Sequence, residues 1–337
     1  MNHVAHSSKQ LCLLVLNGKH LNGKHYYYPM RIYVAGINGM VGSAIAIEAK
    51  AQSHEVIGKS SMELDFTDRK AVFDELQEVR PDSLVIAAAK VGGIGANSSS
   101  PVDFLSINLQ IQTNLLDAAH MAQINKVLFL GSSCIYPKLA HQPILESSLL
   151  TGALEPTNEQ YAIAKIAGLK LVEAYRRQFG HHWINAMPSN LYGPRDNFNL
   201  ESAHVLPTLI HRLHNAKVNS DNKVEVWGDG TPLREFLYVD DLAKACLILL
   251  NNYDDSLAIN IGSGQEISIG NLVVLVSKVI GFSGEIKFNT DRPNGTPRKL
   301  LDSSRIANLG WKPQVSLEDG IALTYNWFLA HQIREGN

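Results

Sequence analysis

Three side chains have the types and the spacing needed to reduce a carbonyl group. Tyr161 and Lys165 lie four residues apart, so both would face the same side of a helix. The lysine ammonium is expected to lower the pKa of the phenol and to hydrogen-bond the ribose of a nicotinamide cofactor, while the phenol passes a proton to a carbonyl oxygen. Ser132, at the end of an expected strand, can donate a second hydrogen bond to that oxygen. The combination predicts a reductase site.

A glycine-rich turn precedes this site in the sequence. The run Arg31–Ala35 ends at Gly36, and glycine recurs at Gly39 and Gly42 before helix-favouring residues. A turn of this kind between a strand and a helix lets a pyrophosphate approach the backbone at the positive end of the helix. It predicts a bound dinucleotide. The residues expected to contact this dinucleotide are Gly36, Ile37, Asn38, Gly39, Met40, Val41, Gly42, Lys59, Leu130, Gly131, Ser133, Lys165, Pro188, Ser189, Asn190, Leu191 and His204.

The end of the second expected strand bears on which dinucleotide binds. Enzymes that prefer NAD usually carry an acidic residue ~20 positions after the turn, where it holds the ribose hydroxyls. Here the chain reads Gly58-Lys59-Ser60-Ser61, with one cation and no carboxylate. Lys59 is either a solvated loop lysine or a partner for a 2′-phosphate. The sequence therefore favours NADP and leaves the use of NAD open.

Strand-like and helix-like segments alternate along the chain. Strands are expected at 31–35, 55–57, 83–88, 126–131 and 183–187, and helices at 43–51, 69–78, 106–122 and 161–179. The alternation predicts an α/β fold with a Rossmann-type doubly wound parallel sheet. We expect residues 30–187 to form the cofactor domain, with a return segment at about 234–262. A smaller α/β substrate-binding domain is expected at 188–233 and 263–330.

The bulk composition is that of a globular enzyme. Hydrophobic residues make up 45% and charged residues 18%, and the net charge of -2 gives no general attraction to nucleic acid or membrane lipid. No stretch approaches the ~20 apolar residues of a membrane helix. Cys12, Cys134 and Cys246 have no metal-ligand spacing, and their odd number argues against a disulfide framework. We expect a cytoplasmic protein that binds neither nucleic acid, membrane nor metal.

The N-terminal segment contains a direct repeat. Leu16–His20 and Leu21–His25 both read LNGKH. Because the duplication has no periodicity, residues 1–29 are interpreted as an extension outside the fold, with Met30 as the functional start.

Cys134 and His204 form a candidate acid–base pair. Cys134 lies two residues after Ser132, so the same strand end would present a thiol beside the hydroxyl. Taken alone, a single cysteine is more often a small buried hydrophobe, and a single histidine is more often a surface or hydrogen-bonded structural side chain.

Several longer stretches are narrower than a general reductase pattern. They are AAAKVGGI at 87–94, LFLGSSCIYPK at 128–138, LEPTNE at 154–159, the segment 161–168, NLYGP at 190–194, DNF at 196–198, VWG at 226–228, GTPLREFL at 230–237 and GTPRKLLD at 295–302. Through them the chain from Arg31 onward resembles the GDP-L-fucose synthase family, within the extended short-chain dehydrogenase/reductase superfamily.

The resemblance implies an NADPH-dependent 3,5-epimerase/4-reductase that converts GDP-4-keto-6-deoxymannose to GDP-L-fucose. Cys134 and His204 would act as base and acid in the epimerisation, because the C4 ketone acidifies the protons at C3 and C5. A thiol serves as a base near neutral pH when a nearby cation favours its thiolate. The residues that the resemblance assigns to the GDP-sugar are Arg212, Trp227, Arg234, Arg298 and Lys299.

The sequence departs from the family pattern at two positions of the expected cofactor site. Asn38 stands where members of the family often carry arginine, and Lys59 is the sole cation at the second strand end. Both differences weaken the preference for NADP.

Two other functions stay open. A GDP-L-colitose synthase, which epimerises only C5 of a 3-deoxy sugar, would keep the same motifs, and a non-catalytic NADP-binding protein would keep the fold. The resemblance also implies a homodimer through the helices at 106–122 and 161–179.

Overall fold

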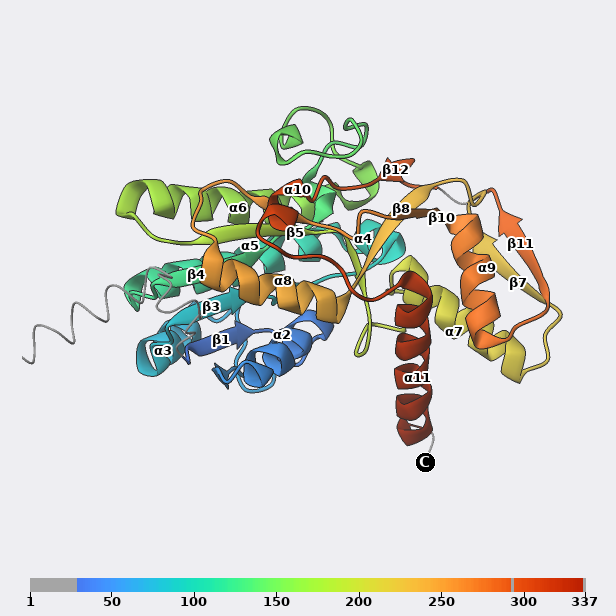
Figure 1. Cartoon of the computed structure of the whole chain (residues 1–337), viewed down its shortest axis with the longest axis horizontal. Helices are drawn as coiled ribbons and strands as arrows, with labels where there is room; N and C mark the ends of the chain where they lie inside the picture. Colours follow the sequence, from blue (N-terminus) through green and yellow to red (C-terminus); the bar gives the residue numbers. More distant parts are fainter. Residues whose placement is uncertain (1–28, 292–293, 336–337) are drawn as a thin grey trace, which may run out of the picture.

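The computed structural model describes residues 29–291 and 294–335 (Figure 1). The LNGKH repeat, Cys12 and the rest of the expected extension before Pro29 lie outside the described residues. In the part of the chain that the structure describes, no helix combines the length and the apolar character needed to cross a membrane.

A six-stranded parallel sheet organises the larger part of the molecule. Its strands, in spatial order, are β2 (Glu55–Ile57), β1 (Arg31–Ala35), β3 (Ser83–Ile86), β4 (Lys126–Leu130), β5 (Ile184–Pro188) and β9 (Ile259–Ile261). The strand order reverses between β1 and β3. In sheets of this kind ligands bind beyond the carboxyl ends of the strands at that reversal. The predicted doubly wound parallel sheet is confirmed.

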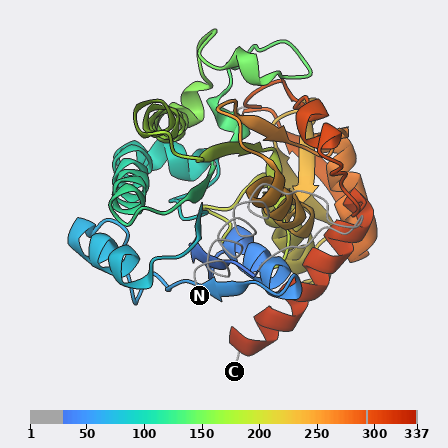
Figure 2. The same cartoon turned by 60° about the vertical axis from the view of Figure 1, so that its left-hand side comes forward.

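Helices cover both faces of this sheet (Figure 2). On one face lie α2 (Met40–Ala51), α8 (Val239–Asn252) and α10 (Ser304–Asn308), and on the other lie α3 (Arg69–Val79), α5 (Pro101–Met121) and α6 (Glu159–Phe179). Successive side chains of a strand point to opposite faces. Accordingly, Ile32 and Val34 belong to the first hydrophobic core, whereas Tyr33 and Ala35 belong to the second.

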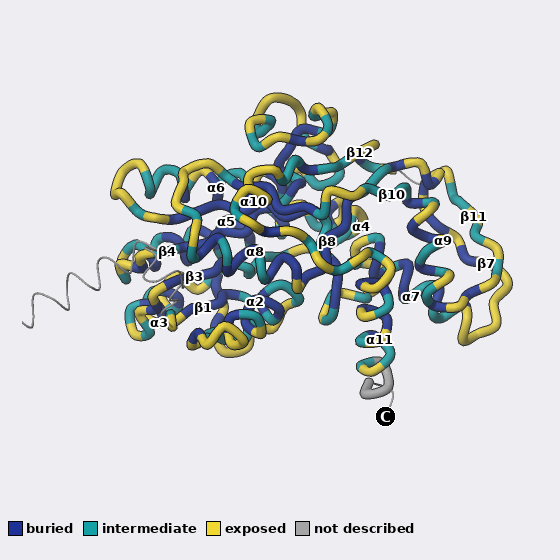
Figure 3. Tube along the Cα trace, viewed as in Figure 1, coloured by how far each residue is buried: buried dark blue, intermediate teal, exposed yellow. Residues whose placement is uncertain are grey.

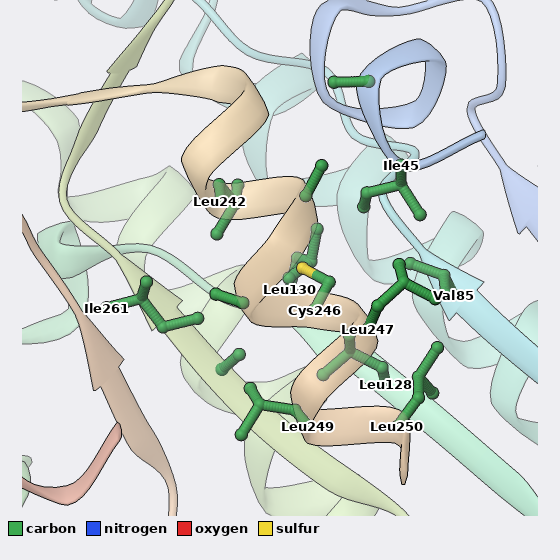
Figure 4. Packing of buried hydrophobic residues seen from close by; sticks show 14 of the residues in the cluster. Ile45, Val85, Leu128, Leu130, Leu242, Cys246, Leu247, Leu249, Leu250 and Ile261 are labelled. Carbon is green, nitrogen blue, oxygen red and sulfur yellow. The ribbon is translucent and has the colours of Figure 1, made fainter. Parts of the chain in front are cut away.

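The two cores fix the strand ends that carry the site. Figure 3 shows the sheet and the inner faces of its helices as the most buried parts of the trace. The first core contains Leu242, Cys246 and Leu249 of α8 together with Leu128 and Leu130 of β4 (Figure 4). Cys246 is therefore a small buried core side chain, and burial raises the pKa of its thiol above the ordinary range.

A smaller unit lies beside the sheet. It contains α7 (Val205–Val218), α9 (Ile269–Ile280) and α11 (Leu317–Glu335), which share a third core. Strand β8 (Leu233–Tyr238) pairs with β6 (Asn190–Tyr192), β10 (Glu266–Ser268) and β12 (Arg298–Lys299), and β7 (Lys223–Trp227) pairs with β11 (Glu285–Asn289). The chain returns to the large sheet through α8 and β9. The limits of the two predicted domains stay a prediction.

The observed elements differ from the expected ones mainly at their ends. β1 and β2 have the expected bounds, but the helix expected to begin at Ser106 begins at Pro101. Proline suits the first turn of a helix because its missing N–H has no intrahelical partner there. Hydrophobic periodicity alone did not mark this start.

Candidate active site

The reducing centre is built where β4 meets α6. After β4, the N–H of Gly131 donates to the carbonyl of Ala186 at 2.9 Å, so Ser132 emerges from the edge of the sheet in a fixed position. Ser132 precedes a short 3-10 turn, Ser133–Ile135, and its hydroxyl hydrogen-bonds the phenol of Tyr161 in the first turn of α6. The structure therefore brings together two of the three predicted reductase side chains as direct partners.

Lys165 lies one turn further along α6 and is buried at 4% exposure. Its Nζ donates to the carbonyl oxygen of Leu130 at 2.9 Å and lies 4.9 Å from the centre of the Phe129 ring. Burial disfavours the charged form and lowers the pKa of Lys165 to about 8. An ammonium carries three donors, so this one retains donors for the ribose hydroxyls of a bound dinucleotide.

The expected lowering of the tyrosine pKa by the lysine is wrong for this structure. The pKa of Tyr161 lies above its ordinary range because the phenol is dehydrated by burial and because the charge of Cys134 opposes the phenolate. The hydrogen bond from Ser132 acts in the opposite direction but does not outweigh these causes. Tyr161 is therefore protonated near neutral pH, which is the form that can donate a proton to a carbonyl oxygen.

The glycine turn has the shape that a pyrophosphate requires. Gly36 has a φ of +90°, and a Cβ atom on Gly42 would lie 2.1 Å from the carbonyl oxygen of Gly36. Gly39 caps α2 without a side-chain hydrogen bond, and the first turn of α2 holds no acidic residue. The N–H groups at this positive helix end thus remain open to an anion, and the residues present fit a dinucleotide.

A cleft of about 350 Å³ continues from this turn along the carboxyl ends of β1, β2 and β3. It is lined by Gly36, Asn38, Gly39, Lys59, Ser60, Ser61, Leu64, Asp65, Phe66, Ala87, Ala88, Ala89, Lys90 and Ile111. The segments 64–66 and 87–90 were not predicted as cofactor contacts. The place of 87–90 at the carboxyl end of the strand expected at 83–88 was a signal that could have found that segment, whereas 64–66 follows the second strand only after a turn.

The thiol of Cys134 has two polar neighbours from distant parts of the chain. The amide Nδ2 of Asn158 donates to its Sγ at 3.2 Å, and Nζ of Lys299 lies 3.7 Å from the same sulfur. The sulfur thus lies within reach of an ammonium and an amide donor from two other segments of the chain. Sequence reasoning missed Asn158, although this residue lies in the quoted LEPTNE stretch.

His204 is held by a contact between two loops. It caps α7, and the N–H of Gly93 donates to the carbonyl of the nearby Ser202 at 2.8 Å. A Cβ atom on Gly93 would lie 2.4 Å from the carbonyl oxygen of Ala203, so only glycine fits this approach. The pKa of His204 is lowered first by the protein atoms packed around its ring and then by the charge of Lys299. Lys299 is thus a common neighbour of the candidate acid and the candidate base.

The five residues assigned to the GDP-sugar lie in three different surroundings. Arg234 and Lys299 are register partners on β8 and β12, and the charges of Arg234 and Cys134 interact. Arg298 is turned elsewhere, because its guanidinium forms a two-pronged ion pair with Glu266 at 2.8 Å. The guanidinium of Arg212 lies 5.7 Å from the centre of the Trp227 ring. The structure does not bring Arg298 to the thiol.

The remaining expected cofactor residues lie at the next strand end. Pro188 ends β5, and the N–H of Ser189 donates to the carbonyl of Ile261 at 2.9 Å. Asn190 and Leu191 belong to β6, where the Asn190 amide donates to the Glu235 carbonyl at 2.8 Å. Among the described residues, no group of three or more histidine, cysteine, aspartate or glutamate side chains could hold a metal ion.

This fold and this arrangement of serine, tyrosine and lysine define a class of enzyme. The model of the family described as "NAD dependent epimerase/dehydratase family" matches residues 32–262. The chain belongs to this family, and the predicted enzyme class is confirmed.

Curated relatives and solved structures narrow the class. The chain is 54% identical over 300 residues to GDP-L-fucose synthase 1 of Arabidopsis thaliana, covering 89% of this chain and 93% of the relative. It is 39% identical over 302 residues to GDP-L-colitose synthase of Yersinia pseudotuberculosis, covering 89% and 98%. A GDP-L-fucose synthetase from Naegleria fowleri bound to NADP matches with a TM-score of 0.83 and 28% identity, covering 91% and 96%. The predicted resemblance to the GDP-L-fucose synthases is confirmed.

Proposed function

We propose that this chain converts GDP-4-keto-6-deoxymannose to GDP-L-fucose by epimerisation at C3 and C5 followed by reduction at C4. The observation that carries the proposal is the thiol of Cys134, which lies beside Lys299 and Asn158 and next to the Ser132–Tyr161 pair. A simple carbonyl reductase would need only the serine, tyrosine and lysine. A base beside them lets one cleft perform both reactions.

The epimerisation uses side chains of this chain alone. The Cys134 thiolate takes the proton from the carbon next to the ketone, and the electron pair of the broken C–H bond moves onto the C4 oxygen. Hydrogen bonds from Ser132 and Tyr161 stabilise that oxygen while it carries negative charge. His204 then donates a proton to the opposite face of the carbon, and the C4 ketone forms again. Exchange of protons with water returns Cys134 and His204 to their starting protonation states.

The reduction uses the centre at β4 and α6. The dinucleotide, when bound, supplies the hydride that C4 accepts. Tyr161 donates its proton to the C4 oxygen, and Ser132 holds that oxygen by a hydrogen bond. The Lys165 ammonium would hold the ribose of the bound dinucleotide and stabilise the negative charge that Tyr161 acquires. The raised pKa of Tyr161 keeps the proton in place until the hydride arrives.

NADP is the proposed dinucleotide, with NAD as a second substrate. The second strand end carries Lys59 and no carboxylate, and a related solved structure holds NADP. Asn38 lies in the cleft as a neutral side chain that can hydrogen-bond either a hydroxyl or a phosphate. The preference for NADPH over NADH is therefore expected to be small.

The test is incubation of the purified chain with GDP-4-keto-6-deoxymannose and NADPH or NADH, with identification of the sugar by NMR. Formation of GDP-L-fucose is expected with both cofactors, faster with NADPH. Turnover of only the 3-deoxy substrate would replace the proposal by GDP-L-colitose synthesis. Cofactor binding without turnover of either sugar would contradict an enzymatic function on these substrates.

We also propose a homodimer through α5 and α6. These helices expose the apolar side chains Val102, Met121, Ile163 and Phe179. Burial of such side chains between two copies would stabilise a dimer. Size-exclusion chromatography with light scattering should give twice the chain mass, and a monomer at micromolar concentration would contradict the dimer.

A further inference from the structure

Lys59 has a buried acidic partner that sequence reasoning did not find. Its Nζ forms a short ion pair with the carboxylate of Glu75, which lies on α3. Glu75 is only 6% exposed, whereas the side chain of Lys59 is 43% exposed and lines the cleft. The two residues are 16 positions apart, one after a strand and one in a helix, so their pairing depends on how α3 packs on the sheet.

The acidic surroundings of Lys59 go beyond this one pair. The pKa of Lys59 is raised first by its hydrogen bond to Glu75, and the charges of Glu75, Glu78 and Glu63 add to the effect. Glu75 also interacts with the phenol of Tyr33, whose pKa is raised first by burial and then by the charge and the hydrogen bond of Glu75. Lys59 is thus the charged group that compensates a buried carboxylate.

The cleft offers a 2′-phosphate little net positive charge. Its other lining lysine, Lys90, forms an ion pair with Asp103 at 2.6 Å. In the portion of the cleft wall that the structure describes, both lysines therefore carry an acidic partner. Of the other polar side chains that line the cleft, Asp65 is acidic, whereas Asn38, Ser60 and Ser61 are neutral and can hydrogen-bond a ribose hydroxyl as well as a phosphate oxygen.

We propose that Glu75 sets the cofactor selectivity of this chain by neutralising Lys59. The buried carboxylate attracts the ammonium away from a bound 2′-phosphate. The interaction is partly screened because Lys59 is half-exposed. Removal of the negative charge should therefore increase the affinity for a 2′-phosphate and leave the affinity for a 2′-hydroxyl nearly unchanged. The inference builds on the proposed NADP-dependent function but concerns a residue that takes no part in the chemistry.

Binding of nucleotide fragments tests the inference without the sugar. The probes are 2′,5′-ADP, which carries the 2′-phosphate, and 5′-AMP, which does not, and calorimetry measures their affinities. Glu75→Gln should bind 2′,5′-ADP roughly threefold to tenfold more tightly, with little change for 5′-AMP. The gain should disappear in the Lys59→Gln/Glu75→Gln double variant. Asp74→Asn removes the same charge from the neighbouring residue, whose partner is Lys70, and should change neither affinity.

The outcomes separate the alternatives. Weaker or unchanged binding of 2′,5′-ADP by Glu75→Gln would overturn the inference, because Glu75 would then orient Lys59 toward the phosphate or have no influence. A thermal melt checks the fold of the variant, and Glu75→Met, of similar volume, replaces it if Glu75→Gln does not fold. The NADPH-to-NADH ratio of kcat/KM should rise by the same factor. Failure to turn over the GDP-sugar would contradict the proposed function and leave the nucleotide result standing.

Discussion

The reducing centre and the epimerising centre are neighbours, but the chain builds them differently. Ser132, Tyr161 and Lys165 come from the end of one strand and the first turns of one helix, on elements fixed by the two cores of the large sheet. Cys134 and His204 depend instead on contacts between segments that are far apart in the sequence. The first centre is local and rigid, and the second depends on packing between loops. Variants should therefore separate the two activities.

The largest expected effect is on reduction. Tyr161→Phe removes the proton that the C4 oxygen receives, so kcat for reduction should fall by about 10²- to 10⁴-fold. Exchange of the C3 and C5 protons with D2O, measured by NMR without cofactor, should continue at a reduced rate, because Ser132 still donates a hydrogen bond to the C4 oxygen. Equal loss of both activities would contradict the separation of the centres.

Cys134→Ser should impair epimerisation instead of reduction. A serine hydroxyl is a much weaker base than a thiolate, so exchange at C3 and C5 should fall by roughly 10²-fold or more. Binding of the dinucleotide should be unchanged, because the glycine turn lies elsewhere. Full product at the rate of the unaltered chain would show that the role assigned to Cys134 is wrong.

Gly93→Ala tests the loop contact that holds His204. The added methyl group would lie 2.4 Å from the Ala203 carbonyl oxygen, so the loop before α7 must move. Exchange at C3 and C5 should fall about tenfold, with a loss of about 1–3 kcal/mol in the free energy of unfolding. Gly95→Ala is the matched control, because its methyl group would lie 3.6 Å from the Glu201 carbonyl oxygen, an ordinary contact. Equal exchange rates in the two variants would exclude this positioning of His204.

The smallest effect concerns pH. Because burial lowers the pKa of Lys165 to about 8, the folded enzyme loses this positive charge as the pH rises through that value. The rate of reduction should be roughly halved near pH 8 and fall further above it. Lys165→Arg should move the alkaline decline to higher pH, since a guanidinium stays charged. If the rate of Lys165→Arg declined over the same pH range as that of the unaltered chain, the decline would come from the titration of another group.

Local patterns predicted the reducing centre, and long-range packing produced most of what they missed. The run Arg31–Ala35 ending in Gly36, and the spacing of Tyr161 and Lys165, specify their geometry within a few residues. Lys299 was predicted to contact the substrate, but not to lie beside Cys134, which is 165 residues away in the chain. This position depends on the pairing of β12 with β8.

Electrostatic surroundings were harder to predict than positions. Lys59 was predicted at the cofactor cleft and lies there, but its pairing with Glu75 required the placement of α3. The pKa of Tyr161 differs from the expectation for the same reason, because burial and the neighbouring Cys134 outweigh the effect assumed from the sequence. Residue spacing does not encode how much water a folded site retains.

The most direct measurement is to run the complete reaction in D2O with NADPH and to determine by NMR which carbons of the product carry deuterium. The proposed mechanism predicts deuterium at C3 and C5, from solvent protons returned by the epimerising centre, and protium at C4, from the cofactor. Protium retained at C3 with deuterium at C5 would mean that only C5 is epimerised. Protium at both positions would contradict the presence of an epimerising centre in this chain.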